Sequence, residues 1–154
     1  MPPKTIIGVL GCPIRKNREG EIEYFLTQRY APQNPKYHLK WQQAGGGLEF
    51  GESPEETLVR EFQEELGVTP EILFPFPIIR SSRRKYPNRH IHLILISYIV
   101  SIADQTPKNT DPDHETSDMG WFTYDAIQEL ENIEDNLFFI NKIIRIIKSE
   151  KLSI

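Results

Sequence analysis

Residues 46–68 read GGLEFGESPEETLVREFQEELGV, and this stretch contains a complete helix pattern and a dense cluster of acidic residues. Ser53, Pro54 and Glu56 form a strong helix start. Serine caps the first turn, proline suits the first helical position, and a glutamate three residues after the cap completes a capping box. Because Gly67 provides a natural stop, we predict a helix from Pro54 to Leu66.

Three glutamates of this helix share one flank of its apolar side. The apolar residues, which should face the core, are Leu58, Val59, Phe62 and Leu66. The acidic residues are Glu61, Glu64 and Glu65, which are neighbours on a helix because they lie three and four positions apart. Each like-charge pair destabilises the helix by roughly a few tenths of a kcal/mol, and acids near its C-terminal end face the negative pole of the dipole. A bound Mg²⁺ ion, or Mn²⁺, would reverse these penalties, whereas the alternative is a solvated acidic face.

The glycines that precede the helix favour the metal-site interpretation. Without side chains, Gly45, Gly46 and Gly47 let backbone groups approach a metal ion or a phosphate closely. An ordinary flexible turn is the alternative. Residues 46–68 carry a charge of −6, from seven glutamates and one arginine, out of a net charge of −4 for the chain. A phosphate-rich substrate would be repelled by this block unless cations lay between them.

Length and composition are those of one ordinary globular domain, which we expect to span residues 1–154. The single cysteine, Cys12, excludes an intramolecular disulfide and favours a reducing, cytoplasmic setting. No apolar run has the length of a signal peptide core or of a membrane span. The negative net charge gives no general attraction to nucleic acid or to an anionic membrane, so neither is an expected partner.

Elsewhere the pattern alternates strands and helices. Strands are predicted at residues 6–14, 22–28, 72–79, 89–101 and 120–124, and a short apolar-aromatic run lies at residues 39–41. A basic loop is expected from Arg80 to Arg89. A closing helix is predicted from Asp135 to Lys148, with one apolar face formed by Leu137, Ile140, Ile144 and Ile147. This order indicates an α/β fold with helices packed on a mixed sheet.

Residues 46–68 also resemble the signature of Nudix hydrolases, G-x5-E-x7-R-E-U-x-E-E-x-G-U, in which U is a bulky apolar residue. The matching residues are Gly46, Glu52, Arg60, Glu61, Phe62, Glu64, Glu65, Gly67 and Val68. A chance match has a probability on the order of 10⁻⁶ over the chain. Two departures are mild: Phe62 stands where an aliphatic residue is usual, and Ala44 stands where many members have proline. The resemblance implies an α/β/α sandwich with a mixed β-sheet between helices.

The resemblance assigns roles to these residues. It implies that Glu61, Glu64 and Glu65, with the backbone carbonyl of Gly46, bind magnesium, and that Arg60 and its partner Glu52 orient the ligands. The implied reaction is attack of a metal-activated water on one phosphorus of a diphosphate. Glu61 is the first choice for the carboxylate that assists the water. In some members this group comes from a later loop, where Glu115 is the equivalent here and Asp113 lies nearby; a solvated loop acid is the alternative for both.

The substrate is predicted from the basic segment and from the resemblance. Arg80, Arg83, Arg84 and Tyr86 are expected to bind the phosphates and stack on the base, although a basic segment can also be plain surface. The chain is similar to compact nucleoside triphosphate diphosphatases, which implies a small nucleotide substrate cleaved to a monophosphate and pyrophosphate. ADP-ribose or another nucleotide sugar, a dinucleoside polyphosphate, and a non-catalytic nucleotide-binding module remain alternatives. The protein is expected to be a monomer or a homodimer.

Overall fold

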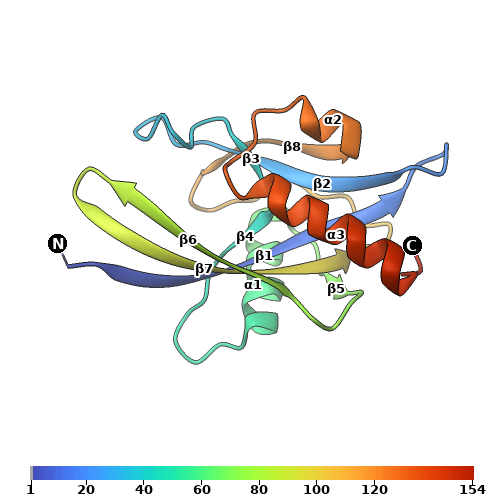
Figure 1. The fold of residues 1–154 in the computed structure, drawn as a ribbon, viewed down its shortest axis with the longest axis horizontal. Coiled ribbons are helices and arrows are strands. Elements are labelled where there is room, and N and C mark those ends of the chain that lie inside the picture. Colours follow the sequence, from blue (N-terminus) through green and yellow to red (C-terminus); the bar gives the residue numbers. More distant parts are fainter. Residues whose placement is uncertain (1) are drawn as a thin grey trace.

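A single eight-stranded sheet forms the centre of the computed structural model, which describes residues 2–154 (Figure 1). The strands are β1 (Lys4–Lys16), β2 (Ile22–Arg29), β3 (Trp41–Gln42), β4 (Ala44–Gly47), β5 (Glu71–Ile72), β6 (Ile78–Tyr86), β7 (Arg89–Ser101) and β8 (Thr116–Thr123). The order β3-β2-β1-β7-β5 runs across the sheet, while β4 pairs with β1, β6 with β7 and β8 with β2. The β1–β7 pair is parallel and the other pairs are antiparallel, so the sheet is mixed.

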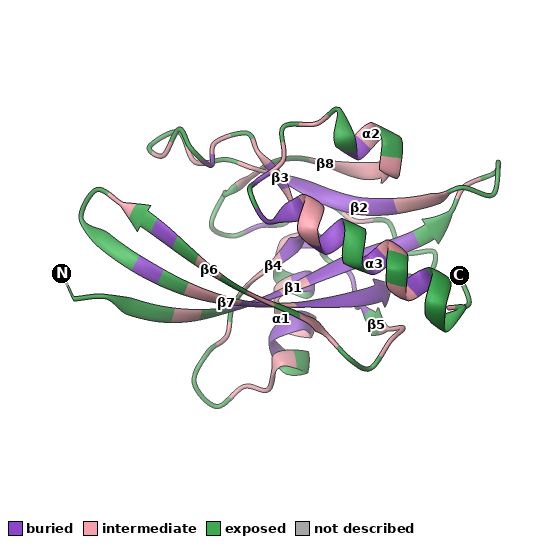
Figure 2. Ribbon diagram, in the orientation of Figure 1, coloured by how far each residue is buried: buried purple, intermediate pink, exposed green. Residues whose placement is uncertain are grey.

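Helices cover both faces of this sheet. They are α1 (Pro54–Leu66), the short α2 (Tyr124–Gln128) and α3 (Asn136–Glu150), and α1 and α3 lie on opposite sides of β1 (Figure 1). Two separate apolar cores result, one beneath each of the two long helices, and the sheet is buried between them (Figure 2). The predicted α/β/α arrangement is therefore confirmed. No helix within residues 2–154 combines the length and the apolar character needed to cross a membrane.

The predicted bounds of α1 match the observed ones because its capping is local. The Ser53 hydroxyl accepts a hydrogen bond from the Glu56 amide at 3.2 Å, and the Glu56 carboxylate accepts one from the Ser53 amide at 3.0 Å. Gly67 ends the helix in the left-handed conformation, with φ of 65°. Close packing on β1 depends on Gly11, where an added Cβ would lie 2.8 Å from Leu58 and Phe62. The helix axis, and the glutamates along it, are thereby fixed against the central strand.

The sequence prediction was wrong in one region of the sheet. Residues 80–89 are not a loop, because strand β6 continues to Tyr86 and only a tight turn separates it from β7. Polar residues occupy both of its faces, so no apolar alternation revealed the strand. The predicted strand at 72–79 is instead two strands, β5 and β6, because Pro75 and Pro77 cannot donate to a ladder.

Two further elements differ from the prediction in extent or orientation. Strand β8 begins at Thr116, four residues before the predicted start at Gly120. The buried face of α3 consists of Asn136, Phe139, Ile140, Ile143 and Ile147. Leu137 and Ile144, which were predicted on that face, are only partly buried at its margin.

Candidate active site

Strand β4 brings the backbone of Gly46 against the carboxylate of Glu61. A Cβ added at Gly46 would lie 2.5 Å from both Cδ and Oε1 of Glu61, so no other residue fits without moving the carboxylate. At Gly45 the backbone φ is 147° and a Cβ would overlap the carbonyl oxygen of Val9. The two glycines thus allow a carboxylate and a strand backbone to meet. Such a set of oxygen atoms fits a hard divalent cation.

Arg60 organises the carboxylates around this point. Its guanidinium donates two hydrogen bonds to Glu52, at 2.7 and 3.0 Å, and one to Oε1 of Glu61 at 2.8 Å. A fourth, at 3.0 Å, reaches the carbonyl oxygen of Gly47. The hydrogen bonds from Arg60 lower the pKa of Glu52 to about 2, with the Glu49 amide contributing, and the same bonds raise the pKa of Arg60. The structure therefore brings Arg60 and Glu52 together, and the positioning roles that the resemblance implies for them stay predictions.

The stability of the fold should depend on the ionisation of Glu52 in acid. Because its pKa is lower in the folded state, its contribution to stability is complete above the ordinary pKa of 4.5 and is lost as the pH falls toward about 2. We expect Glu52→Gln to be less stable than wild type near neutral pH, with the difference vanishing by about pH 2. Urea unfolding at a series of pH values measures this, with the turn residue Glu19→Gln as control. A difference that is the same at every pH would contradict the role of the ionised carboxylate.

Glu65 is buried close to three other acidic residues. Burial raises the pKa of its carboxyl, and a hydrogen bond with Glu61 and the charges of Glu61, Asp111 and Glu115 raise it further. Glu64 is different, because its side chain is 47% exposed and its nearest cation is Arg60 Nη1 at 3.5 Å. Across residues 2–154, no three acidic, histidine or cysteine side chains converge closely enough to form a complete metal-binding set. The structure thus brings Glu61 and Glu65 together and leaves Glu64 at the rim.

A loop at residues 108–116 is tied to the C-terminal end of α1. The Thr110 amide donates to the carbonyl of Glu65 at 3.0 Å, and the Thr110 hydroxyl donates to the carbonyl of Glu64 at 2.9 Å. Within the loop, the buried Asp111 carboxylate accepts hydrogen bonds from the Asp113 and Glu115 amides, each at 3.0 Å. Asp111 was not predicted from the sequence, although an aspartate that begins a D-P-D turn is a recognisable signal. Asp111 holds the backbone of Glu115 in a fixed position relative to α1.

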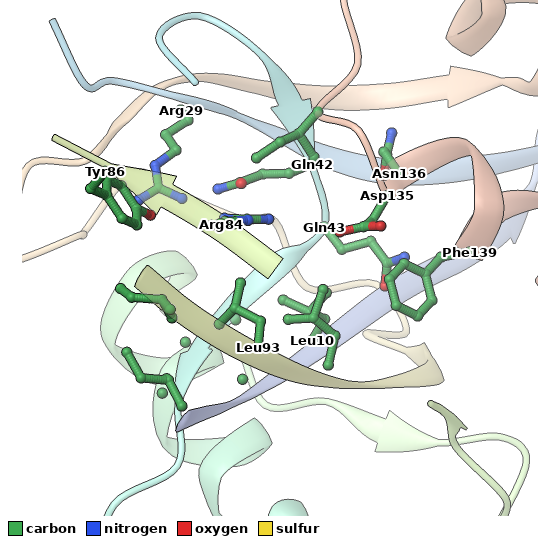
Figure 3. A pocket seen from close by; sticks show the side chains of 18 of the residues that line it. Leu10, Arg29, Gln42, Gln43, Arg84, Tyr86, Leu93, Asp135, Asn136 and Phe139 are labelled. Atoms are coloured by element: carbon green, nitrogen blue, oxygen red, sulfur yellow. The ribbon is translucent and has the colours of Figure 1, made fainter. Parts of the chain in front are cut away.

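A cavity of about 290 Å³ opens beside the glycines, on the α3 side of the sheet (Figure 3). Gly45, Gly46 and Gly47 line one part of it. Its apolar walls come from β1, β7 and α3, and include Ile6, Leu10, Leu93, Leu95 and Phe139. The cavity therefore starts at the strand that touches Glu61 and extends under the first turn of α3.

Several buried polar groups that line this cavity lack a hydrogen-bond partner. Gln43 accepts a bond from the Ser97 hydroxyl at 2.5 Å, which leaves its Nε2 unpartnered. Asn136 donates to Asn132 at 2.7 Å, and its Oδ1 is unpartnered. Asp135 accepts from Arg80 on one oxygen, whereas its Oδ2 and the Nε of Arg84 are unpartnered. A polar ligand in this cavity would satisfy these groups, as buried polar groups normally are.

The four predicted substrate-binding residues all lie in strand β6, but on two different faces of it. Arg80, Arg84 and Tyr86 share one face of the strand, and Arg84 and Tyr86 line the cavity. Arg80 pairs with Asp135 at 2.8 Å. Arg83 alternates to the opposite face, where it is exposed, so the structure does not bring it to the cavity. Three lining residues were not predicted, because nothing in their local sequence signals that they meet: Gln43, Asp135 and Asn136.

Known proteins resemble this chain in sequence and in fold. The NUDIX domain profile matches residues 6–140. The nucleoside triphosphatase NudI of Enterobacter is 29% identical over 146 residues, covering 92% of this chain and 98% of that protein. The 8-oxo-dGTP diphosphatase of Escherichia coli is 39% identical over 80 residues, covering 52% of this chain and 57% of that protein.

Two solved structures share the fold. The MutT Nudix hydrolase of Burkholderia pseudomallei has a TM-score of 0.68 and 19% identity, covering 90% of this chain and 98% of that one. The ORF135 protein of Escherichia coli has a TM-score of 0.66 and 24% identity, covering 93% of this chain and 91% of that one. At these identities the likeness concerns the fold alone.

Proposed function

Because the chain belongs to the Nudix family of pyrophosphohydrolases, we propose that it hydrolyses a nucleoside triphosphate to a nucleoside monophosphate and pyrophosphate. One observation carries this proposal. The cavity joins the glycine strand beside Glu61 to the unpartnered polar groups of Gln43, Asp135 and Asn136. A nucleotide whose base is bound by Gln43, Asp135 and Asn136 has its phosphates on the side of the glycine strand. NudI, a nucleoside triphosphatase, is related along almost its whole length.

The unpartnered atoms favour guanine as the base. Asp135 and Asn136 are adjacent and each offers an acceptor oxygen, whereas Gln43 offers a donor. The pairing edge of guanine has the complementary pattern, since N1–H and the N2 amino group donate and O6 accepts. Phe139, Leu10 and Leu95 supply apolar surface for the faces of the ring. A pyrimidine would leave part of this set unsatisfied, which costs binding energy.

The phosphates would pass over Gly45–Gly47 toward α1. Glu61, Glu64 and Glu65, with the carbonyl of Gly46, are the residues that would hold Mg²⁺ or Mn²⁺, as is typical of the family. Such an ion neutralises charge on phosphoryl oxygens and lowers the pKa of a water molecule that it binds. The chain's own residues position the reaction, because the hydrogen bonds of Arg60 aim Glu61 at the strand and Asp111 fixes the loop of Glu115.

In this scheme a water oxygen forms a bond to a phosphorus of the polyphosphate. The bridging P–O bond on the far side of that phosphorus breaks, and pyrophosphate leaves with the electron pair. Glu61 accepts the proton that the water loses, and the hydrogen bond from Arg60 at 2.8 Å holds its carboxylate in place. Glu115, whose charge contributes to the raised pKa of Glu65, is the alternative acceptor.

A substrate panel tests the proposal. With Mg²⁺ and GTP, dGTP, ATP, CTP, UTP, ADP-ribose and a diadenosine polyphosphate, we expect the highest kcat/KM for the guanine triphosphates, measured as the nucleoside monophosphate that each compound releases. Asn136→Ala should reduce the guanine preference by about tenfold to a hundredfold, which corresponds to the loss of one buried hydrogen bond. Asn141→Ala is the matched control, because Asn141 lies on the same helix and bonds only Tyr124.

The panel also separates the competing functions. Equal kcat/KM for all bases would contradict guanine recognition. Higher turnover of ADP-ribose or of the diadenosine compound would replace the triphosphate assignment. Nucleotide binding without turnover of any compound would identify a binding module instead of an enzyme.

A further inference from the structure

Strand β6 forms a free edge of the sheet. Its nine residues, Ile78–Tyr86, pair with β7 on one side, and no other strand within residues 2–154 pairs with them. No backbone hydrogen bond joins them to another segment of the described chain either. The hairpin of β6 and β7 extends beyond the helices (Figure 1), and β6 contains no proline and no register shift. A regular edge of this length can accept a further strand.

The face of β6 that points away from the cavity is uncovered. Four residues that alternate along the strand form this face, and all four are exposed: Ile79, Ser81, Arg83 and Lys85. Helix α1 lies on this side of the sheet but packs mainly on β4 and β1. The side chain of Ile79 is therefore left 62% exposed. A strand added at the edge would contact these four side chains and would bury Ile79.

The charge of this edge is entirely positive. Strand β6 has four basic residues and no acidic one: Arg80, Arg83, Arg84 and Lys85. Within residues 2–154, neither Arg83 nor Lys85 forms an ion pair. Their partners on β7 are His92 and His90, so the neighbouring strand supplies no carboxylate. Negative charge for this face has to come from a bound molecule.

Two other occupants fit this edge less well than an acidic polypeptide. A second copy of the chain, paired along β6, would align two sets of like charges, and like charges on facing strands are destabilising. A single-stranded nucleic acid needs aromatic side chains on which its bases stack, and the exposed face of β6 has none. An extended polypeptide has the backbone donors and acceptors that pair with a strand edge. Acidic side chains on it would also neutralise Arg83 and Lys85.

We propose that β6 binds an extended acidic segment of another protein, which adds to the sheet as an antiparallel strand. The antiparallel direction is expected because it is the slightly more stable pairing. Side chains on one face of a strand recur at every second residue, so the partner has carboxylates opposite Lys85 and Arg83 and an apolar residue opposite Ile79. Along the partner this pattern reads acidic-x-acidic-x-x-x-apolar. The interaction does not depend on the proposed function.

Fluorescence anisotropy tests the proposal with a labelled, capped peptide of sequence E-T-E-T-S-T-I. The charge-reversed peptide K-T-K-T-S-T-I and a single-stranded oligothymidylate are the comparison probes. We expect wild type to bind the acidic peptide at least about tenfold more tightly than the basic one, because two cross-strand charge pairs change from attractive to repulsive. The double variant Arg83→Glu with Lys85→Glu should lose this preference. The matched double variant Arg145→Glu with Lys148→Glu should keep it, because both residues are exposed on α3.

Amide hydrogen exchange followed by NMR distinguishes strand addition from general charge attraction. The β6 amides that do not bond to β7 should exchange at least about tenfold more slowly when the acidic peptide is bound, since each new backbone hydrogen bond protects its donor. The amides of α3 should exchange at an unchanged rate.

Several results would overturn the proposal. Equal binding of the two peptides, or a preference that survives Arg83→Glu with Lys85→Glu, would remove the charge recognition. Peptide binding without slower exchange in β6 would indicate contact through side chains alone. Tighter binding of the oligothymidylate than of the acidic peptide would indicate a nucleic-acid surface, and a dimer in which the β6 amides are protected without peptide would assign the edge to a second copy. If the double variant does not fold, Arg83→Glu alone gives the same comparison.

Discussion

Glu65→Gln is expected to reduce kcat/KM by about 10²–10³-fold while making the metal-free protein more stable. The activity falls because a carboxylate that would hold the metal ion becomes neutral, and losses of this size follow removal of one group that stabilises the transition state. The stability rises because the fold does not accommodate a negative charge at this position. Burial, Glu61, Asp111 and Glu115 all raise the pKa of Glu65. Glutamine retains the shape of the side chain without the charge.

The pH dependence of this variant follows from the direction of the shift. A carboxyl whose pKa is raised on folding stabilises the protein fully below its ordinary pKa of 4.5, and that contribution is lost as the pH rises. Wild type should therefore lose stability relative to Glu65→Gln above about pH 4.5. Urea unfolding in EDTA measures the difference, with the exposed Glu71→Gln as control. Added Mg²⁺ should stabilise wild type more than Glu65→Gln.

Two results would contradict the prediction for Glu65→Gln. Turnover in Glu65→Gln equal to that of wild type would remove Glu65 from the metal site. A variant that is less stable than wild type in EDTA near pH 7 would show that the ionised carboxylate is favourable in the fold.

Gly46→Ala should lower kcat/KM by about a hundredfold, because an added Cβ displaces the Glu61 carboxylate. The methyl group would lie 2.5 Å from Cδ of Glu61, so the side chain must move by about an ångström, and misplacements of that size cost about 10²-fold. The Mg²⁺ concentration for half-maximal rate should rise together with this loss. Steady-state kinetics over a magnesium titration measures both.

The adjacent glycine provides a matched control. A Cβ at Gly47 meets nothing within 4 Å, although Gly47 lies in the same strand. Gly47→Ala should therefore leave the Glu61 carboxylate in place and the magnesium dependence unchanged. Equal losses in both variants would indicate that the flexibility of the glycine strand matters, and not the space beside Glu61.

The sequence predicted well those features that depend on local interactions. The capping box, the proline at the first position and the glycine stop are adjacent in sequence, and the helix bounds agree with the structure. The pairing of Arg60 with Glu52 could be expected from the family signature, and both residues act from within one short segment. Strand β7 was also predicted at its observed bounds, because its apolar residues continue for many positions.

The remaining features depend on contacts between distant segments. Gln43 lies in the link between β3 and β4, and Asp135 and Asn136 begin α3, about 90 residues later, so no local pattern connects them. Strand β6 was not predicted because one of its faces borders a polar cavity and the other borders solvent, so its sequence has no apolar alternation. Arg83 and Arg84 are neighbours in sequence, but the alternation of a strand directs them to opposite faces. The composition of residues 80–89 suggested one basic surface, whereas the structure places the basic side chains of β6 on two opposite faces.

The parallel pairing of β1 with β7 also has a consequence for the order of folding. The ten pairs from Lys4–Ile91 to Pro13–Val100 join segments almost ninety residues apart, so β1 leaves the ribosome long before its main partner is made. Until then β1 has only β2 and β4 as strand partners. The helix α1, which caps itself, can form early, but the sheet against which it packs is completed only when β7 inserts beside β1. Closure of this long loop is thus the step on which assembly of the whole site depends.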